Sequence, residues 1–326
     1  MKKMHVLALL LLSGLFILTA FFTPIPPKTL TKVQLGKKLF EDKILSIDSS
    51  VSCSSCHQEK FAFADTAAFS KGIYGRFTKR NTPSVLNMLN RPYFFWDGRA
   101  ASLEEQALMP IQNPDEMGMT IDETVKRLTL HPEYPILFKR IFKESPSEKT
   151  LAAALAAYEA TLETVDSKFD DWSNGLTNLS ANEEAGRALF VGSKAKCFNC
   201  HSMEDFTDDN FKNIGLYDGQ KFNDVGRFTI TQDPKDLGKF KTPGLRNIAV
   251  TAPYMHNGMF KTLEEVVDYY NTPSKYVAAP LHTDPDLQQP LNLSNKEKAQ
   301  LVAFLKTLTD KKFLPKKGTL TAPKKA

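Results

Sequence analysis

The chain reads as a succession of amphipathic helices separated by polar loops. Capping boxes at Ser180–Glu183, Thr262–Glu265 and Ser294–Glu297 each precede a stretch with apolar residues at helical spacing, and they predict three helix starts. Strong helix formers with an apolar stripe predict another long helix over residues 149–165. Residues 204–243 are rich in Asp, Asn, Gly and Lys without clear periodicity, which predicts an extended loop. The pattern therefore predicts a mainly α fold with long loops and few strands.

The first 22 residues have the features of an export signal. Lys2 and Lys3 precede an apolar run over residues 6–22, and a cluster of prolines directly after it prevents the helix from continuing. If it is not cleaved, a run of this length could barely span a bilayer. We expect an exported, periplasmic protein in which residues 1–22 are a signal peptide or an N-terminal anchor. A buried N-terminal helix is the alternative.

Composition narrows the class of protein only slightly. With 326 residues, 42% hydrophobic and 24% charged, the chain has the balance of a globular protein of about two domains. The net charge of +5 includes Lys2, Lys3 and a basic tail over residues 316–326, so the body of the chain is close to neutral. We therefore expect no nucleic-acid partner.

All four cysteines fall in two motifs of the form Cys-x-x-Cys-His. The motifs span residues 53–57 and 197–201. Two thiols three positions apart on one turn can add to the two vinyl groups of a haem, and the imidazole of the next residue then reaches the iron. The pattern predicts two covalently bound haem c groups, attached through Cys53, Cys56, Cys197 and Cys200, with His57 and His201 as iron ligands.

Two other uses of these cysteines are possible on spacing alone. A zinc ribbon places its CxxC pairs about 15–20 residues apart, whereas these begin 144 positions apart. Disulfides within CxxC pairs suit an exported protein, but they are strained and usually redox-active. Haem attachment accounts for both histidines and leaves no cysteine over.

The chain also repeats itself. A helix signature, Gly-x-x-Leu-Phe, precedes each haem motif at residues 36–40 and 186–190. Downstream, matches persist at a constant shift of 160 positions: Thr82-Pro83 with Thr242-Pro243, Asn87 with Asn247, Trp96-Asp97-Gly98 with His256-Asn257-Gly258, and Leu103-Glu104-Glu105 with Leu263-Glu264-Glu265. The repeat predicts two homologous cytochrome c-like haem lobes, over residues 30–165 and 166–315, followed by the basic tail.

Differences between the repeats are informative because equivalent positions should surround each haem in the same way. His256 stands in the second lobe where the first has Trp96, and Tyr270 stands where the first has Pro110. A phenolate can bind haem iron, whereas proline has no side-chain donor atom. Tyr270 is thus a candidate axial ligand of the second haem.

Several longer motifs resemble one family, the bacterial dihaem cytochrome c peroxidases and their MauG-like relatives. The resemblance runs from Leu35 to about Leu308. Its most specific stretches are Lys79-Arg80-Asn81-Thr82-Pro83-Ser84, Phe95-Trp96-Asp97-Gly98-Arg99, Leu103-Glu104-Glu105-Gln106, Asn113-Pro114-Asp115-Glu116-Met117-Gly118 and Thr251-Ala252-Pro253-Tyr254-Met255-His256-Asn257-Gly258.

The resemblance implies that the first haem is the peroxide site. Glu116 would act over it as an acid–base catalyst, with Gln106 as its polar neighbour, and Trp96 would carry electrons between the haems. Without the resemblance, Glu116 would be interpreted as a helix-start carboxylate and Trp96 as core packing.

The resemblance also implies a calcium ion between the lobes, bound by Asn81 and by the backbone carbonyls of Thr251 and Pro253. Oxygen ligands suit this hard cation. Implied partners are hydrogen peroxide, a small cytochrome c or cupredoxin as electron donor, and a second copy of the chain in a homodimer.

This chain departs from the peroxidase pattern in two places. Many of these peroxidases have a histidine that blocks the peroxide iron, but residues 58–79 contain none, and only Lys71 and Tyr74 could substitute for it. At the second haem Tyr270 replaces a methionine, which is the MauG-like choice. Met255 and Met259 remain competing ligands, and a buried core role remains an alternative for Tyr270.

Three functions follow from this reasoning. The first is a peroxidase that reduces hydrogen peroxide to water with electrons passed through the second haem. The second is a MauG-like maturase that oxidises a protein substrate through a high-valent state of the two haems. The third is a non-catalytic dihaem electron carrier.

Overall fold

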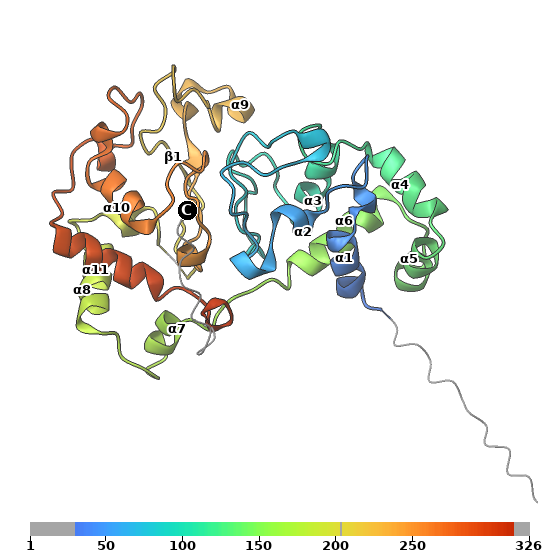
Figure 1. Cartoon of the computed structure of the whole chain (residues 1–326), viewed down its shortest axis with the longest axis horizontal. Coiled ribbons are helices and arrows are strands. Elements are labelled where there is room, and N and C mark those ends of the chain that lie inside the picture. Colours follow the sequence, from blue (N-terminus) through green and yellow to red (C-terminus); the bar gives the residue numbers. More distant parts are fainter. Residues whose placement is uncertain (1–29, 203, 316–326) are drawn as a thin grey trace, which may run out of the picture.

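The chain forms two helical lobes that lie side by side (Figure 1). This computed structural model describes residues 30–202 and 204–315. One hydrophobic core is built from residues between Leu35 and Tyr158, and a second from residues between Phe190 and Leu308. The predicted mainly α, two-lobed architecture is confirmed.

Six α-helices make up the first lobe, with short 3₁₀ turns between them. They are α1 (Lys32–Glu41), α2 (Cys53–Cys56), α3 (Leu103–Gln112), α4 (Ile121–Leu130), α5 (Tyr134–Phe142) and α6 (Glu148–Glu159). The first of them, α1, begins with a capping box in which the Thr31 hydroxyl accepts from the Gln34 amide. The apolar faces of α1, α3 and α6 meet in the first core.

The second lobe has five α-helices and one small sheet. They are α7 (Lys168–Ser173), α8 (Ala181–Val191), α9 (Phe228–Thr231), α10 (Leu263–Asn271), α11 (Asn295–Lys306), β1 (Phe211–Lys212) and β2 (Phe240–Lys241). The strands pair antiparallel, with Phe211 opposite Lys241. The three predicted capping boxes open α8, α10 and α11 and are confirmed.

In each lobe the first and last long helices cross at a glycine. A β-carbon on Gly36 of α1 would lie 1.9 Å from the carbonyl oxygen of Ala154 in α6, and one on Gly186 of α8 would lie 1.9 Å from that of Gln300 in α11. Only glycine allows such a close approach. The same crossing, built twice, confirms the internal duplication predicted from the sequence.

A second pair of equivalent residues fixes the loop that follows each haem motif. Asn87 and Asn247 both adopt positive φ, at 57° and 63°. Their amides donate to the carbonyls of Leu162 (2.8 Å) and Leu308 (2.9 Å), just beyond the last helix of each lobe. Each loop is thereby tied to the helix crossing.

This tie also explains where the predicted helix over residues 149–165 was wrong. The helix ends at Glu159. Beyond it the Asn87 side chain accepts from the Thr164 amide (3.2 Å) and hydroxyl (2.7 Å), and these bonds compete with continuation of the helix. The predicted loop over residues 204–243 is confirmed in outline, although it contains β1, β2 and the short helix α9.

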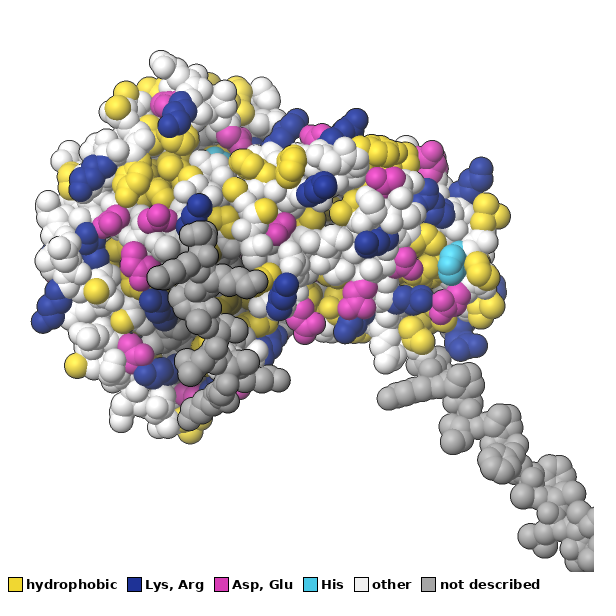
Figure 2. All heavy atoms as spheres, in the orientation of Figure 1, with side chains coloured by type: hydrophobic (Ala, Val, Ile, Leu, Met, Phe, Trp, Pro, Cys, Tyr) yellow, Lys and Arg dark blue, Asp and Glu magenta, His cyan; other side chains and the backbone are white. Residues whose placement is uncertain are grey.

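Within the described part of the chain, no helix combines the length and apolarity needed to cross a membrane. The predicted signal or anchor at residues 1–22 and the basic tail at 316–326 lie outside the described residues. Basic and acidic side chains are interspersed over the face of both lobes seen in Figure 2.

The helix crossing predicts that replacing a helical glycine with alanine lowers the stability of the protein, contrary to the usual effect of this change. Helix propensity alone would make Gly186→Ala stabilising by about 1 kcal/mol, but the new methyl group must displace the backbone of α11, which costs about 1–3 kcal/mol. We therefore expect a lower denaturant midpoint for the holoprotein. Ala188→Gly, at an exposed position of the same helix, measures the propensity difference alone. A higher midpoint for Gly186→Ala would contradict the tight crossing.

Candidate active site

The first haem motif forms one helical turn with its histidine directly after it. Cys53 and Cys56 are the ends of α2, and the His57 amide donates to the Cys53 carbonyl at 2.8 Å. The His57 Nδ1 donates to the carbonyl oxygen of Phe63 at 3.1 Å, which leaves Nε2 as the free nitrogen. Burial lowers the pKa of His57, so the imidazole is neutral and can offer a lone pair to iron.

The second motif repeats this arrangement. The His201 amide donates to the Cys197 carbonyl at 2.9 Å, and its Nδ1 donates to the carbonyl oxygen of Phe206 at 2.9 Å. Burial lowers the pKa of His201 as well. All four cysteines carry free thiols, so the alternative of two disulfides is not formed.

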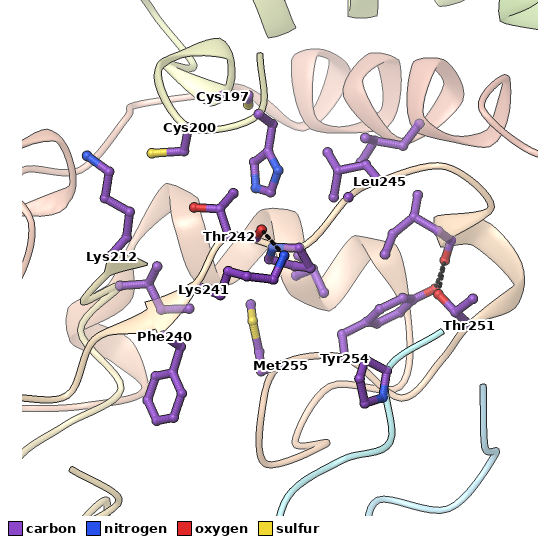
Figure 3. Close-up of a pocket in the computed structure, with 18 of the residues that line it drawn as sticks. Cys197, Cys200, Lys212, Phe240, Lys241, Thr242, Leu245, Thr251, Tyr254 and Met255 are labelled. Atoms are coloured by element: carbon purple, nitrogen blue, oxygen red, sulfur yellow. Dashed lines mark hydrogen bonds between the residues drawn. The ribbon is translucent and has the colours of Figure 1, made fainter. Parts of the chain in front are cut away.

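A cavity of about 300 Å³ lies beside the second motif (Figure 3). Cys197, Cys200 and His201 are on its wall, together with Tyr270. Much of the remaining wall is apolar, including Leu263, Val267, Leu291, Leu301 and Leu305. Two thiols and a neutral imidazole on an apolar cavity fit haem c. Among the described residues no three His, Cys, Asp or Glu side chains are grouped to hold a bare metal ion, which argues against zinc.

Tyr270 lies in α10, half-buried at the wall of this cavity. Its neighbour Tyr269 donates its hydroxyl to the carbonyl of Ile214 at 2.6 Å, whereas the Tyr270 hydroxyl makes no hydrogen bond with the described residues. The role of a satisfied core tyrosine therefore belongs to Tyr269. Burial raises the pKa of Tyr270, so the phenol stays neutral unless a cation lies beside it.

The two competing methionines differ in position. Met255 lines the cavity and projects into it from the side opposite Cys197 (Figure 3). Met259 does not line the cavity, and its sulfur accepts from the Asn257 side-chain amide at 3.6 Å. Met255 is thus the rival to Tyr270 as the axial ligand.

Glu116 lies in the loop after α3, close to the first haem motif. Its Oε1 accepts from the Asn113 side-chain amide at 2.7 Å, and its charge reaches the thiols of Cys53 and Cys56. Burial raises the pKa of Glu116, and the charge of Arg99 opposes this rise. The interpretation as a helix-start carboxylate is wrong, because the next helix begins at Ile121.

Residues 58–79, which contain no histidine to block the peroxide iron, pack against the Glu116 loop. The Ile73 amide donates to the Glu116 carbonyl at 2.9 Å, and a β-carbon on Gly72 would lie 2.1 Å from the Asp115 carbonyl oxygen. Lys71 is exposed and Tyr74 is 65% exposed, which disfavours both as iron ligands.

Gln106, the expected neighbour of Glu116, lies half-buried on α3. No hydrogen bond between the Gln106 and Glu116 side chains is present among the described residues, so this pairing stays a prediction.

Trp96 lies where the two lobes meet. Its indole nitrogen donates to the Asn81 carbonyl at 2.8 Å, and its ring lies 6.5 Å from that of His256 at an interplanar angle of 72°. His256 in turn stacks on Phe240 at 3.8 Å. Burial lowers the pKa of His256 to about 4, so its ring is neutral at physiological pH. The equivalent positions of the two repeats thus face each other across the interface.

Sequence reasoning missed the partly buried ion pairs that join the lobes near this contact. Arg80 binds Asp97 in its own lobe at 2.6 Å and Asp224 in the other lobe at 2.7 Å. Arg91 pairs with both Asp205 and Asp209. Arg80 and Asp97 belong to recognised motifs, but the partners in the other lobe are too distant along the chain for spacing to reveal them.

The calcium site stays a prediction, and its three expected ligands share the wall of one cavity. Asn81, Thr251 and Pro253 line the same cavity at the lobe interface. The Asn81 amide nitrogen donates to the carbonyls of Ala67 (3.2 Å) and Ala68 (3.3 Å), which fixes the side chain and leaves its oxygen for other partners. An oxygen-only set of this kind fits calcium.

Comparisons with known proteins agree with this geometry. Residues 30–178 match the family model for di-haem cytochrome c peroxidase. The chain is 41% identical over 290 residues to the methylamine utilization protein MauG of Methylorubrum extorquens, covering 86% of this chain and 79% of that protein. It is 34% identical over 323 residues to the cytochrome-c peroxidase IdrP1 of a Pseudomonas species, covering 88% and 83%. A solved MauG-like protein associated with microbial copper homeostasis matches with a TM-score of 0.78 at 37% identity, covering 86% and 90%.

The cavity supports a test of the second haem's ligand. We expect Tyr270→Met to raise the reduction potential of this haem and to change its absorption spectrum, because a neutral thioether favours reduced iron more than a phenolate does. Optical redox titration of the holoprotein measures both. Met255→Leu is the control and should leave both unchanged. A potential moved by the control and unmoved by Tyr270→Met would assign the ligand to Met255.

Proposed function

This chain belongs to the dihaem cytochrome c peroxidase and MauG family, and we propose from that premise that it reduces hydrogen peroxide to water. The observation that carries the proposal is Glu116, a half-buried carboxyl beside the first haem motif. Residues 58–79, which pack against its loop, offer no histidine to block the iron. Haem c is the family's cofactor, and the two motifs fit it.

The proposed roles at the first haem begin with proton movement. The bound haem would supply the iron and electrons for breaking the O–O bond, and one peroxide with two electrons and two protons gives two waters. Glu116 would accept the proton of the near oxygen and deliver it to the far one. Its raised pKa suits this exchange, because burial makes its carboxylate a better proton acceptor than an exposed carboxylate. Asn113 would hold the carboxyl in place.

Electrons would enter at the second lobe and cross at the lobe interface. Trp96 supports this route because its ring meets His256 there. The proposed lobes span residues 30–165 and 166–315, because one hydrophobic core lies within each range. A small cytochrome c or cupredoxin is the proposed donor.

A MauG-like maturase is the second candidate, and Tyr270 favours it. An anionic oxygen ligand lowers a haem potential and would favour storage of oxidising equivalents on the haem pair. One relative bears the name MauG. The partner in this case would be a protein substrate.

The remaining proposals concern assembly and location. A calcium ion at Asn81, Thr251 and Pro253 would bridge the lobes and hold the Trp96 contact. Export to the periplasm rests on residues 1–22, and a homodimer rests on the family resemblance alone.

Two measurements on the holoprotein separate the candidates. Electron paramagnetic resonance of the ferric protein should give a high-spin signal from the first haem, whereas low-spin signals from both haems would leave only the electron carrier. Steady-state oxidation of a reduced small cytochrome by peroxide then separates the enzymes. Rapid turnover supports the peroxidase, and slow turnover with a long-lived oxidised species supports the maturase.

Glu116→Gln removes the proton carrier while preserving shape. We expect peroxide turnover to fall by about 10²-fold or more, the usual size of an acid–base contribution, with both haems retained. Glu144→Gln is the matched control, because that carboxyl is exposed and makes no salt bridge with the described residues. Equal turnover in Glu116→Gln and the control would remove Glu116 from the reaction.

A further inference from the structure

Glu159 is a buried acid that the proposed reaction does not use. It is the last residue of α6 and is 4% exposed. Its Oε2 is fully buried without a hydrogen-bond partner in the described residues, and no cation there forms a salt bridge with it. Buried polar groups are usually paired, so an unpaired carboxyl needs an explanation.

The duplicated helix crossing locates this carboxyl. Gly36 meets Ala154 and Tyr158 of α6, as Gly186 meets Gln300 and Phe304 of α11. Tyr158 and Phe304 are therefore equivalent residues of the two repeats. The residues that follow them, Glu159 and Leu305, are equivalent as well.

Leu305 lines the cavity of the second haem motif. Its counterpart should therefore lie against the first haem, and the charge of Glu159 does act on the thiol of Cys53. The first lobe thus has a carboxyl where the second has an apolar wall.

We propose that Glu159 is a second acid of the first haem pocket, which binds a proton when that haem is reduced and releases it when the haem is oxidised. The inference rests on the haem attachment in the proposed function, and it adds to Glu116 a group that stores a proton without touching peroxide. At a pH between the pKa of Glu159 in the oxidised protein and its pKa in the reduced protein, each electron that reduces the haem would be accompanied by uptake of up to one proton at Glu159.

The surroundings of Glu159 favour this coupling. Burial raises its pKa to about 8, so the group is protonated at neutral pH. Two titratable groups face it. One is Cys53, whose thiol would be used in haem attachment, and the other is Tyr158, whose pKa is also raised by the charges of Glu41 and Glu59. All are neutral or acidic. Oxidation adds positive charge to the haem and favours the carboxylate, whereas reduction favours the acid.

The test is the reduction potential of the first haem as a function of pH, measured by optical redox titration of the holoprotein. In the wild type the potential should fall as pH rises through about 8, because the carboxylate stabilises oxidised iron. Glu159→Gln should abolish this fall, and Glu159→Leu, which copies the second lobe, should abolish it too. Glu41→Gln, an exposed acid paired with Lys37, is the charge-matched control and should retain it.

An unchanged pH dependence in Glu159→Gln would overturn the proposal. This variant preserves shape, so it answers the question even if Glu159→Leu fails to fold. The result is separable from the proposed function, because the potential is measured without peroxide. Loss of turnover with an intact pH-linked potential would reject only the peroxidase, and a missing first-haem spectrum would reject the haem site itself.

Discussion

In each lobe the imidazole that follows the second cysteine donates its Nδ1 proton to a backbone carbonyl, at Phe63 in one case and Phe206 in the other. This bond fixes the ring's tautomer and orientation, so Nε2 is the nitrogen available to iron. Two further features are repeated around it in each lobe. The asparagine at positive φ ties the following loop to the helix crossing, and the glycine allows the helices to touch.

Because both lobes use this frame, their equivalent residues can meet at the interface. Asn81 is the link: its carbonyl accepts from Trp96, and its amide donates to the carbonyl of His256 at 2.7 Å. A short hydrogen-bonded path therefore joins the aromatic positions of the two repeats. The pairs of Arg80 with Asp224 and of Arg91 with Asp209 also join the lobes, and their partial burial gives them more weight than surface pairs would have.

The sequence carried most of the local information. Capping boxes predicted the helix starts because they involve residues only three positions apart. The repeat predicted the equivalence of the lobes because its short motifs recur at a constant shift. The end of α6 could not be predicted, because the side chain of Asn87, far along the chain, pairs with the residues beyond it. The pairing of Arg80 with Asp224 could not be predicted either, because it forms only where the two lobes contact each other. Glu159 could have been noticed in the sequence as a charged residue on the mostly apolar face of the predicted helix.

The functional asymmetry then follows from a few substitutions on one shared frame. The crossing and the histidine bond are the same in both lobes, so they cannot distinguish a site of chemistry from a site of electron transfer. Three positions differ between the lobes and can distinguish the two sites. The first lobe has a proline, Trp96 and Glu159 where the second has Tyr270, a histidine and a leucine. The first difference places an oxygen donor only at the second haem. The last places an acid only in the first lobe, so in the proposed reaction the duplicated fold would separate electron entry from proton transfer through these side chains.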